Sequence, residues 1–294
     1  MIGLLRRWGE LVTFSHTIFM MPFAAAAVAL ALAVPHEPLT LVRVLAMAGC
    51  MVTARSSAMA FNRWADRVID AKNPRTRARP VAAGRIKPIE ALALTFVSGA
   101  AFCGLALSLG RWPGLLALPV LAILLGYSYA KRFTWAAHAW LGLALALAPG
   151  GAWIAMGAAP GLGIVLLMIA VLAWLFGFDV LYALQDEHFD RNEGLQSVPA
   201  RFGAKRALVM AALAHVLTVG ALVGTGLALH RGAVYFAGVG VVALVLVVEH
   251  RLVRPKDASA GPVDFARIGK AFFDCNAYVS LGFFVTTAID AALR

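Results

Sequence analysis

Residues 163–185 read GIVLLMIAVLAWLFGFDVLYALQ, and this stretch decides the fold class. Asp179 is its only charged residue. A helix needs about 20 mostly apolar residues to cross the hydrocarbon core of a bilayer, and the stretch is long enough to do so. It is also continuous and far longer than a strand of a membrane barrel, so it predicts a transmembrane α-helix.

Eight other stretches are similarly apolar, although two of them, 113–128 and 233–249, are short. The chain is 61% hydrophobic and only 14% charged. A soluble protein carries about 25% charged residues, so this chain cannot cover its surface in the same way. We therefore expect an all-α integral membrane protein of about nine transmembrane helices, forming a single polytopic domain over 1–294. The remaining six spans are predicted near 14–34, 41–62, 89–109, 134–157, 206–229 and 268–292.

The distribution of Lys and Arg predicts the orientation in the membrane. With the N-terminus in the cytoplasm, 21 of the 26 Lys and Arg residues fall in cytoplasmic segments, and four fall on the opposite side. Arg55 is left within a span. The long connecting segments 63–88, 186–205 and 250–267 are then all cytoplasmic. We expect a multi-pass protein of the inner (cytoplasmic) membrane, with its active-site rim on the cytoplasmic side.

The net charge of +11 is of a size that is common in nucleic-acid-binding proteins. Here the cations lie between apolar segments, so topology and an anionic substrate explain them better. We expect membrane lipid and small-molecule substrates as partners, with no nucleic acid and no obligatory protein partner. The three cysteines are scattered in apolar segments without a CxxC pair, which indicates buried small side chains rather than metal ligands.

A first acidic motif, NRWADRVID at 62–70, ends the second predicted span. At 100° per residue, Asn62, Asp66 and Asp70 fall within an arc of about 80° on one face of a helix. Arg55 lies on the same face, further back along the span. Oxygen ligands of this kind suit Mg²⁺.

A second acidic motif, FDVLYALQDEHFD at 178–190, ends the sixth predicted span and repeats this pattern. Asp179, Tyr182, Asp186 and Asp190 again fit within about 80° of one helical face. Each motif is followed by a segment with Pro and Gly and then by another span, and the two motifs are four helices apart. A duplicated four-helix unit would place the two acidic helix ends opposite each other across a central cavity.

Acidic residues at the ends of spans are often only solvated, and those of the first motif could pair with Arg63 or Arg67. We interpret these two arginines as pointing away from the acidic face and setting topology. Two matching motifs argue against mere solvation, as do Asp179 and Arg55, which fall inside their spans. A charge in the hydrocarbon region is costly and by default indicates function.

Two carboxylate clusters with many cations suit a diphosphate. Mg²⁺ between its oxygens and the aspartates, with Lys or Arg alongside, neutralises the charge that develops as the C–O bond breaks. Candidate cations are Arg55 and the pair Lys131 and Arg132 in the turn between spans four and five, although that pair could also be a plain positive-inside anchor. A site at the membrane rim suits an amphiphile such as a polyprenyl diphosphate.

A transporter for a divalent cation or an organic anion is an alternative from another class. Transporter sites lie near the bilayer midplane, often at broken helices. The acidic residues of this chain cluster instead at the predicted cytoplasmic ends of the spans, with basic segments between them. The sequence therefore favours an enzyme.

Three segments resemble the UbiA superfamily of membrane prenyltransferases. NRWADRVIDAKNPRTRARPVAAGRI at 62–86 resembles the first aspartate-rich motif, and DVLYALQDEHFDRNEGLQSVPARFG at 179–203 resembles the second. GYSYAKRFTWAAHAWLGLALALAPGGAW at 126–153 is similar to the segment after span four. The resemblance implies a helical bundle around a central cavity that opens laterally to lipid. It also implies Mg²⁺-dependent transfer of a prenyl group from its diphosphate to an aromatic acceptor.

The matching positions imply roles for individual residues. Metal and diphosphate binding, with catalysis by the aspartates, is implied for Asn62, Asp66, Asp70, Asp186 and Asp190. Contact with diphosphate oxygens is implied for Arg55, Lys131 and Arg132, and a place in the cavity, against substrate, for Asp179 and Tyr182.

Arg63 stands where the family often has a second Asp, and in this respect the chain resembles the subgroup of 4-hydroxybenzoate polyprenyltransferase-like proteins. The acceptor implied is 4-hydroxybenzoate, in ubiquinone or menaquinone biosynthesis, or alternatively a dihydroxynaphthoate of the futalosine route. His16 and His138 could bind the acceptor's carboxylate or phenol, although an intramembrane histidine more often bonds a neighbouring helix.

Overall fold

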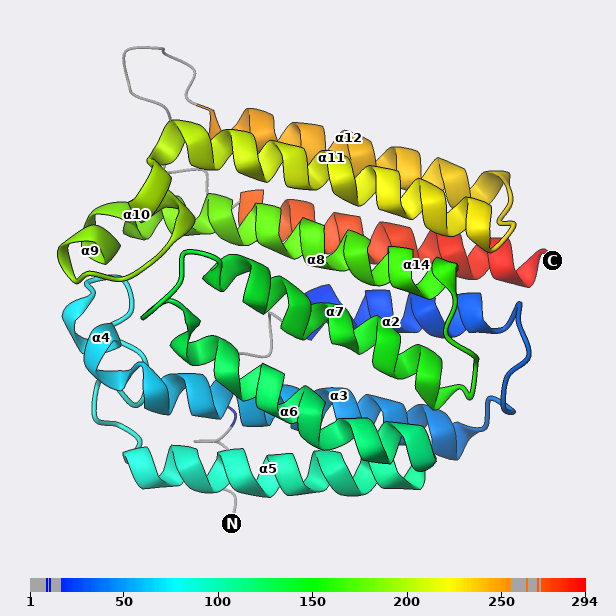
Figure 1. Cartoon of the computed structure of the whole chain (residues 1–294), viewed down its shortest axis with the longest axis horizontal. Helices are drawn as coiled ribbons and strands as arrows, with labels where there is room; N and C mark the ends of the chain where they lie inside the picture. The colour runs from blue at the N-terminus through cyan, green and yellow to red at the C-terminus, as the bar shows by residue number, and fades with distance from the viewer. Residues whose placement is uncertain (1–8, 10, 12–16, 255–262, 264–268, 270) are drawn as a thin grey trace. The chain divides into compact units, whose positions relative to one another are not determined.

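The computed structural model describes residues 9, 11, 17–254, 263, 269 and 271–294, and every regular element in these ranges is helical (Figure 1). His16 lies outside the described residues. The chain divides into two compact units, one of residues 1–18 and 38–129 and the other of residues 19–37 and 130–294. The single domain expected over 1–294 stays a prediction.

Seven helices within the described ranges are long and apolar enough to cross a membrane. Two shorter helices, α2 (Thr17–Ala31) and α14 (Asn276–Ala292), correspond to the first and last predicted spans. A π-helical turn, Ala271–Cys275, precedes α14. The seven are α3 (Leu41–Ala65), α5 (Pro88–Ser108), α6 (Arg111–Ala130), α7 (Ala137–Ala155), α8 (Leu162–Ala183), α11 (Ala204–Ala228) and α12 (Ala233–Val253).

The two spans predicted to be short are longer than expected. Helix α6 begins before 113–128 and ends after it, and α12 continues past 249 to Val253. The apolar pattern marks only the part of a helix that suits lipid. The backbone hydrogen bonds continue through the polar residues at its ends.

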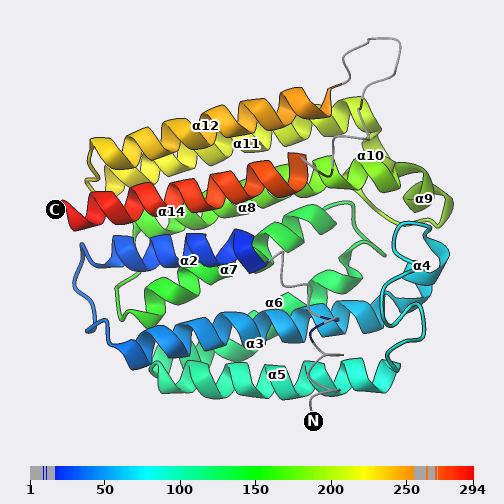
Figure 2. The same ribbon diagram turned by 180° about the vertical axis from the view of Figure 1, so that it is seen from behind.

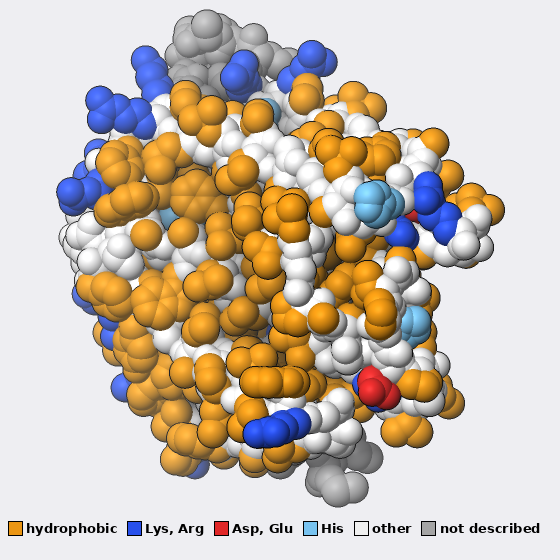
Figure 3. Space-filling view, turned by 45° about the vertical axis from the view of Figure 1, so that its right-hand side comes forward, with side chains coloured by type: hydrophobic (Ala, Val, Ile, Leu, Met, Phe, Trp, Pro, Cys, Tyr) orange, Lys and Arg blue, Asp and Glu red, His pale blue; other side chains and the backbone are white. Residues whose placement is uncertain are grey.

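Large apolar side chains are exposed along the outside of the spans. Val42 on α3, Phe96 on α5 and Val216 on α11 are 77%, 72% and 70% exposed. Hydrophobic side chains also cover most of the face in Figure 3. Soluble monomers rarely expose apolar patches of more than a few hundred Å² (roughly 300–600 Å² at most). This surface is therefore suited to lipid, in agreement with a multi-pass integral membrane protein.

In the first unit, α3 packs along α5 and the two lie side by side in both views (Figures 1 and 2). The Ser57 hydroxyl of α3 donates to the Thr95 carbonyl of α5 at 2.9 Å. At Gly99 of α5 an added Cβ would lie 3.3 Å from the Ser57 oxygen, so a small residue allows this close approach. The packing directs the ends of α3 and α5 toward the loop that connects them.

In the second unit, α8 is the most buried span and packs against both α7 and α11. Gly177 permits the contact with α11, because a Cβ at that position would meet the His215 ring at less than van der Waals distance. Helices α12 and α14 pack together in the same unit. The Asp290 carboxylate of α14 accepts hydrogen bonds from the Gly232 and Tyr235 amides and so caps the start of α12.

A buried polar network connects four helices of the second unit. The Trp174 indole of α8 donates to Asn276 Oδ1 of α14 at 2.8 Å, and Asn276 Nδ2 donates to Glu249 Oε1 of α12 at 3.0 Å. His215 Nδ1 of α11 lies 3.9 Å from Glu249 Oε2 and 3.0 Å from His250 Nε2. Glu249 is only 1% exposed, and the network satisfies its Oε1, whereas Oε2 has no hydrogen-bond partner in the described part of the chain.

We expect Glu249→Ala to lower the free energy of unfolding by about 1–2 kcal/mol, because it leaves the Asn276 amide without its acceptor. Glu249→Gln retains the acceptor oxygen and should unfold like the unmodified protein. Thermal unfolding in detergent micelles measures both. Val248→Ala, at a half-exposed position of the same helix, is the control, and equal stability of Glu249→Ala and this control would contradict the expectation.

Candidate functional site

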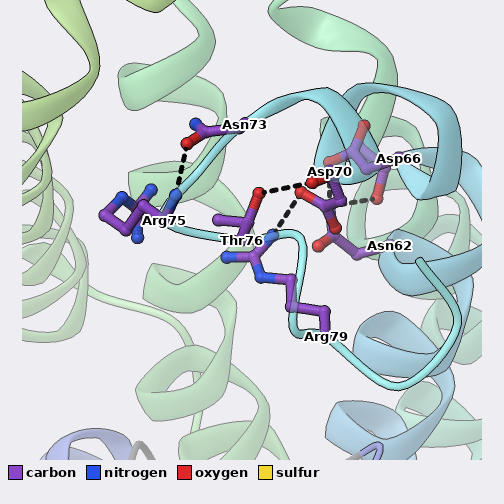
Figure 4. Close-up of polar contacts among 8 residues, drawn as sticks. Asn62, Asp66, Asp70, Asn73, Arg75, Thr76 and Arg79 are labelled. Atoms are coloured by element: carbon purple, nitrogen blue, oxygen red, sulfur yellow. Dashed lines mark hydrogen bonds and ion pairs between the residues drawn. The ribbon is translucent and has the colours of Figure 1, made fainter. Parts of the chain in front are cut away.

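The first acidic motif lies at a break in the helix. Helix α3 ends at Ala65, and Asp66 has φ −91° and ψ 1°, outside the helical region. A six-residue helix, α4 (Arg67–Lys72), follows directly. The i to i+4 pattern nevertheless persists, because the Asp66 amide donates to the Asn62 carbonyl at 2.9 Å and the Asp70 amide to the Asp66 carbonyl at 2.8 Å. The expected clustering of Asn62, Asp66 and Asp70 is therefore preserved across the break (Figure 4).

The side chains of this cluster are buried and hydrogen-bonded. Asn62 Nδ2 donates to Asp66 Oδ2 at 3.0 Å and also lies 3.4 Å from the Ser128 hydroxyl of α6. Asp66 is 1% exposed and Asp70 3% exposed. Arg79 donates to Asp70 Oδ1 at 2.7 Å, which makes this carboxylate one half of an ion pair. The helix break thus holds two carboxylates at a depth where charge needs a partner.

The loop after α4 positions Arg79. The Asn73 side chain accepts a hydrogen bond from the Arg75 amide at 2.9 Å, and the buried Thr76 hydroxyl donates to the Asp70 carbonyl at 3.3 Å (Figure 4). These bonds fold the loop back over the end of the motif and bring Arg79 to Asp70. No role was predicted for Arg79. It lies nine residues after Asp70 in a loop, where no helical periodicity relates the two positions.

The donor set of this motif fits a hard cation such as Mg²⁺. Its side-chain donors are carboxylate and amide oxygens, the ligands that Mg²⁺ prefers. Asp70 Oδ2 is buried and has no hydrogen-bond partner in the described part of the chain. A buried acceptor without a partner costs about 1–3 kcal/mol, which a bound cation would offset. Within the described ranges, no group of three or more His, Cys, Asp or Glu side chains is arranged to hold a metal.

The prediction that Arg63 points away from the acidic face is wrong. Arg63 is buried, and it interacts electrostatically with both Asp70 and Asp66. Helical direction fixes where the Cβ points, but a long arginine side chain can still keep its charge within electrostatic range of the acids. Arg67 agrees better with the expectation, because it donates to the Trp64 carbonyl at 2.7 Å and lies over the Trp64 ring.

Tyr127 of α6 joins Arg55 to this cluster. It interacts electrostatically with Arg55, Arg63 and Asp66, and it hydrogen-bonds Ser128. Tyr127 is thus within electrostatic range of both Arg55 and Asp66, and the place of Arg55 on the acidic face stays a prediction. Tyr127 and Ser128 were not predicted from the sequence. Their signal was two adjacent polar residues just before Lys131, at the end of an otherwise apolar span.

The second acidic motif has the same kind of break. Helix α8 ends at Ala183, a 3₁₀ turn covers Leu184–Asp186, and the six-residue α9 (Glu187–Asn192) follows. Asp186 has φ −101° and ψ 3°, close to the values at Asp66. This sparsely populated region is one where many active-site residues lie. The common local structure is what the predicted internal repeat would produce.

A basic side chain and a hydroxyl lie near Asp190. The Ser197 hydroxyl hydrogen-bonds Asp190, and Asp186 and Lys131 lie within electrostatic range of it. Ser197 also caps the short helix α10 (Val198–Phe202), where it accepts from the Ala200 amide. The Gln196 amide donates to the Lys131 carbonyl at 2.6 Å, so the turn after α6 is tied to this loop. The structure thus places Asp186 and Lys131 within electrostatic range of Asp190.

Three other predicted site residues also lie in the second unit. Tyr182 is half-buried and packs against an apolar cluster that includes Leu181 and Val198. Arg132 is exposed at the turn after α6. Asp179 contacts His138, with 2.7 Å between Asp179 Oδ2 and His138 Nδ1. Both residues were predicted from the sequence as candidate site residues, but their pairing was not.

Comparison with known proteins agrees with these features. The model of the UbiA prenyltransferase family matches residues 20–273. A 4-hydroxybenzoate octaprenyltransferase of Aromatoleum aromaticum is 31% identical over 260 residues, which cover 86% of this chain and 82% of that protein. A protein of the same name from Xanthomonas campestris pv. campestris is 33% identical over 248 residues, covering 84% and 79%.

Solved structures show the same fold. A UbiA homolog from Aeropyrum pernix K1, without ligand, superposes with a TM-score of 0.81 at 31% identity, covering 94% of this chain and 98% of the other. A UbiA homolog from Archaeoglobus fulgidus bound to GPP and Mg²⁺ gives 0.71 at 18% identity, covering 96% and 99%. Together with the family match over most of the chain, these findings show that this protein belongs to the UbiA prenyltransferase family.

Proposed function

We propose that this protein transfers a polyprenyl group from a polyprenyl diphosphate to an aromatic acceptor, with 4-hydroxybenzoate as the first candidate, in quinone biosynthesis. The observation that carries the proposal is the pair of acidic motifs, each at a helix break of the same local geometry. The names of the relatives support the acceptor, and the GPP and Mg²⁺ held by the Archaeoglobus homolog support the donor class and the metal.

In this proposal each acidic motif binds Mg²⁺ and, through it, the diphosphate. Asn62, Asp66 and Asp70 supply oxygen ligands in one unit, and Asp186 and Asp190 supply them in the other. Bound Mg²⁺ supplies electrostatic stabilisation of the negative charge that develops on the leaving diphosphate. The orphaned oxygen Asp70 Oδ2 and the all-oxygen donor set are the features of this chain that support the assignment.

The cations of the chain assist departure of the leaving group. Lys131, held near Asp190, and Arg55 and Arg132 are proposed to contact diphosphate oxygens and so favour heterolysis of the C–O bond. Breaking this bond leaves an allylic carbocation, which the electron-rich ring carbon beside the acceptor's hydroxyl attacks. Tyr182 and Asp179 are proposed to contact substrate. An apolar surround excludes water from the cation and prevents hydrolysis.

A dihydroxynaphthoate, as in the futalosine route to menaquinone, is the alternative acceptor. Arg63 supports retaining a dihydroxynaphthoate as a candidate acceptor, because this residue occupies a position where the commonest form of the first motif has Asp. Its guanidinium lies near Asp66 and Asp70, so the charge balance of the motif differs from that common form. Assays with both acceptors distinguish the two.

Purified protein with Mg²⁺, an allylic polyprenyl diphosphate and each acceptor should yield a C-prenylated product. Chelation of the metal should abolish the product, and Mg²⁺ or Mn²⁺ should restore it. Asp66→Asn and Asp186→Asn should each reduce turnover to background while the protein folds normally, because each removes a carboxylate ligand. Glu193→Gln, at an exposed acid outside the motifs, is the control. Full activity of both Asp variants would refute the metal assignment.

Arg79→Ala should lower turnover by about 10–100-fold, because Asp70 loses the partner that orients it. Arg79→Lys should fall between this variant and the unmodified protein, since an ammonium keeps the charge without the guanidinium geometry. Steady-state rates over a range of Mg²⁺ concentrations measure the effect. The control is Arg77→Ala, at an exposed arginine of the same loop. Rates that match this control would exclude an orienting role.

We also propose that the N-terminus and the segments 63–88, 186–205 and 250–267 lie in the cytoplasm. The excess of Lys and Arg in these segments supports this orientation. Alkaline phosphatase, which is active only outside the cytoplasm, should be inactive when fused after Arg85 and active when fused after Arg294, because nine spans separate the termini. The reverse pattern of activities would show the opposite orientation.

A further inference from the structure

His138 and Asp179 form a close pair in the interior of the second unit. His138 is the second residue of α7, and Asp179 lies in the last turns of α8. His138 Nδ1 and Asp179 Oδ2 are 2.7 Å apart, a distance typical of a charge-assisted hydrogen bond. The imidazole is buried, whereas the carboxylate side chain is 24% exposed.

The pair is held by close packing of α7 on α8. Gly142 lies one turn beyond His138, and a Cβ at this position would meet the Leu172 carbonyl oxygen at 2.7 Å. The two helices therefore approach to backbone contact next to the pair. Phe176 of α8 meets the imidazole edge to face, with ring centroids 6.4 Å apart. The ring is fixed both by its carboxylate and by its neighbours.

The contact with Asp179 determines which nitrogen of His138 carries the proton. A carboxylate oxygen can only accept, so Nδ1 donates to it, and in the neutral ring Nε2 is then an acceptor. Nε2 is buried and has no hydrogen-bond partner among the residues for which the structure is described. A buried acceptor without a donor calls for an explanation, and a ligand that brings an O–H or N–H group supplies one.

The surroundings suit the hydroxyl of an aromatic acceptor. His138 is within electrostatic range of Asp190 of the second acidic motif, which in turn interacts with Asp186 and Lys131. The pair therefore lies near residues that the proposed function assigns to the diphosphate. The lone pair of Nε2 matches an O–H donor, which a hydrocarbon tail does not carry.

We propose that His138 is the base that binds and deprotonates the phenol of the acceptor, and that Asp179 is the positioning residue that sets its tautomer and orientation. This inference rests on the proposed function and adds a step to it. The phenolic O–H bond breaks and its proton passes to Nε2, while the electron pair left on oxygen feeds the ring carbon that attacks the allylic cation. The new C–C bond forms after the C–O bond of the donor has broken and the diphosphate has left with the electron pair of that bond.

Formation of the C–C bond gives a cyclohexadienone that carries one hydrogen on the alkylated carbon. This hydrogen leaves as a proton to the departed diphosphate, and its bonding pair restores the aromatic ring. The phenoxide oxygen then takes back the proton held on Nε2. His138 is thus regenerated, and no other reactant is consumed.

His138→Gln is the informative variant, because its amide can still donate to Asp179 but has no basic nitrogen. We expect it to lower kcat by about 100-fold or more, with the KM for the polyprenyl diphosphate unchanged. Asp179→Asn should also lower kcat, because an amide that donates to Nδ1 favours the wrong tautomer. His36→Gln, at an exposed histidine, is the control.

A ring-fluorinated form of the acceptor separates a base from a structural residue. Fluorine beside the hydroxyl makes the phenol more acidic, so it ionises with less help. The ratio of unmodified to His138→Gln rates should then shrink by about tenfold or more, whereas the loss from a purely structural defect would be equal for both acceptors. An equal loss, or a His138→Gln enzyme as fast as the control, would overturn the proposal.

A binding measurement keeps the inference distinct from the proposed function. Isothermal titration should show that the protein binds 4-hydroxybenzoate more tightly than benzoate, and that His138→Phe removes this preference. Prenylated product together with an unchanged preference in His138→Phe would overturn the role of His138 alone. Absence of any prenylated product from the unmodified protein would overturn the proposed function, and the titration would still decide whether a phenol binds at His138.

Discussion

The burial of charge in an apolar helical protein is the constraint on which the rest of the structure depends. Asp66 and Asp70 are almost inaccessible to solvent, and a carboxylate at such depth is stable only with hydrogen bonds or an opposite charge. The chain supplies both, from the amide of Asn62 and from Arg79. The partners of these carboxylates come from a loop and from α6 as well as from α3. The first motif is therefore a tertiary arrangement rather than a helix end.

The helix breaks at Asp66 and Asp186 serve the same purpose in the two units. At each break the backbone leaves the helical region for one residue and then re-enters a six-residue helix. The i to i+4 relation between acidic residues survives, while the chain after the break turns into a loop that carries further polar groups. In the first unit that loop brings Arg79 to Asp70, and in the second it brings Ser197 to Asp190. A continuous helix could not bring its own following loop back to the motif in this way.

Buried polar groups elsewhere in the second unit illustrate the difference between stability and function. In the network of Trp174, Asn276 and Glu249, three helices exchange hydrogen bonds with each other, and its role is adequately explained by helix association. In the His138 and Asp179 pair, one nitrogen faces a carboxylate and the other faces nothing that satisfies it in the described structure. Glu249 Oε2 in the network is also buried without a partner in the described part of the chain, so what distinguishes His138 is its place within electrostatic range of Asp190 in the second acidic motif.

The sequence by itself determined the spans and the two acidic motifs, because both follow from hydrophobicity and helical periodicity, which are properties of consecutive residues. It also placed Arg55 on the acidic face. Only the tertiary structure decided the partners: Arg63 buried within electrostatic range of the acids, Tyr127 and Arg79 near the first motif, and His138 against Asp179. These contacts depend on how long side chains bend, how loops fold back and which faces of two helices meet, and none of these is encoded in the spacing of residues along one helix.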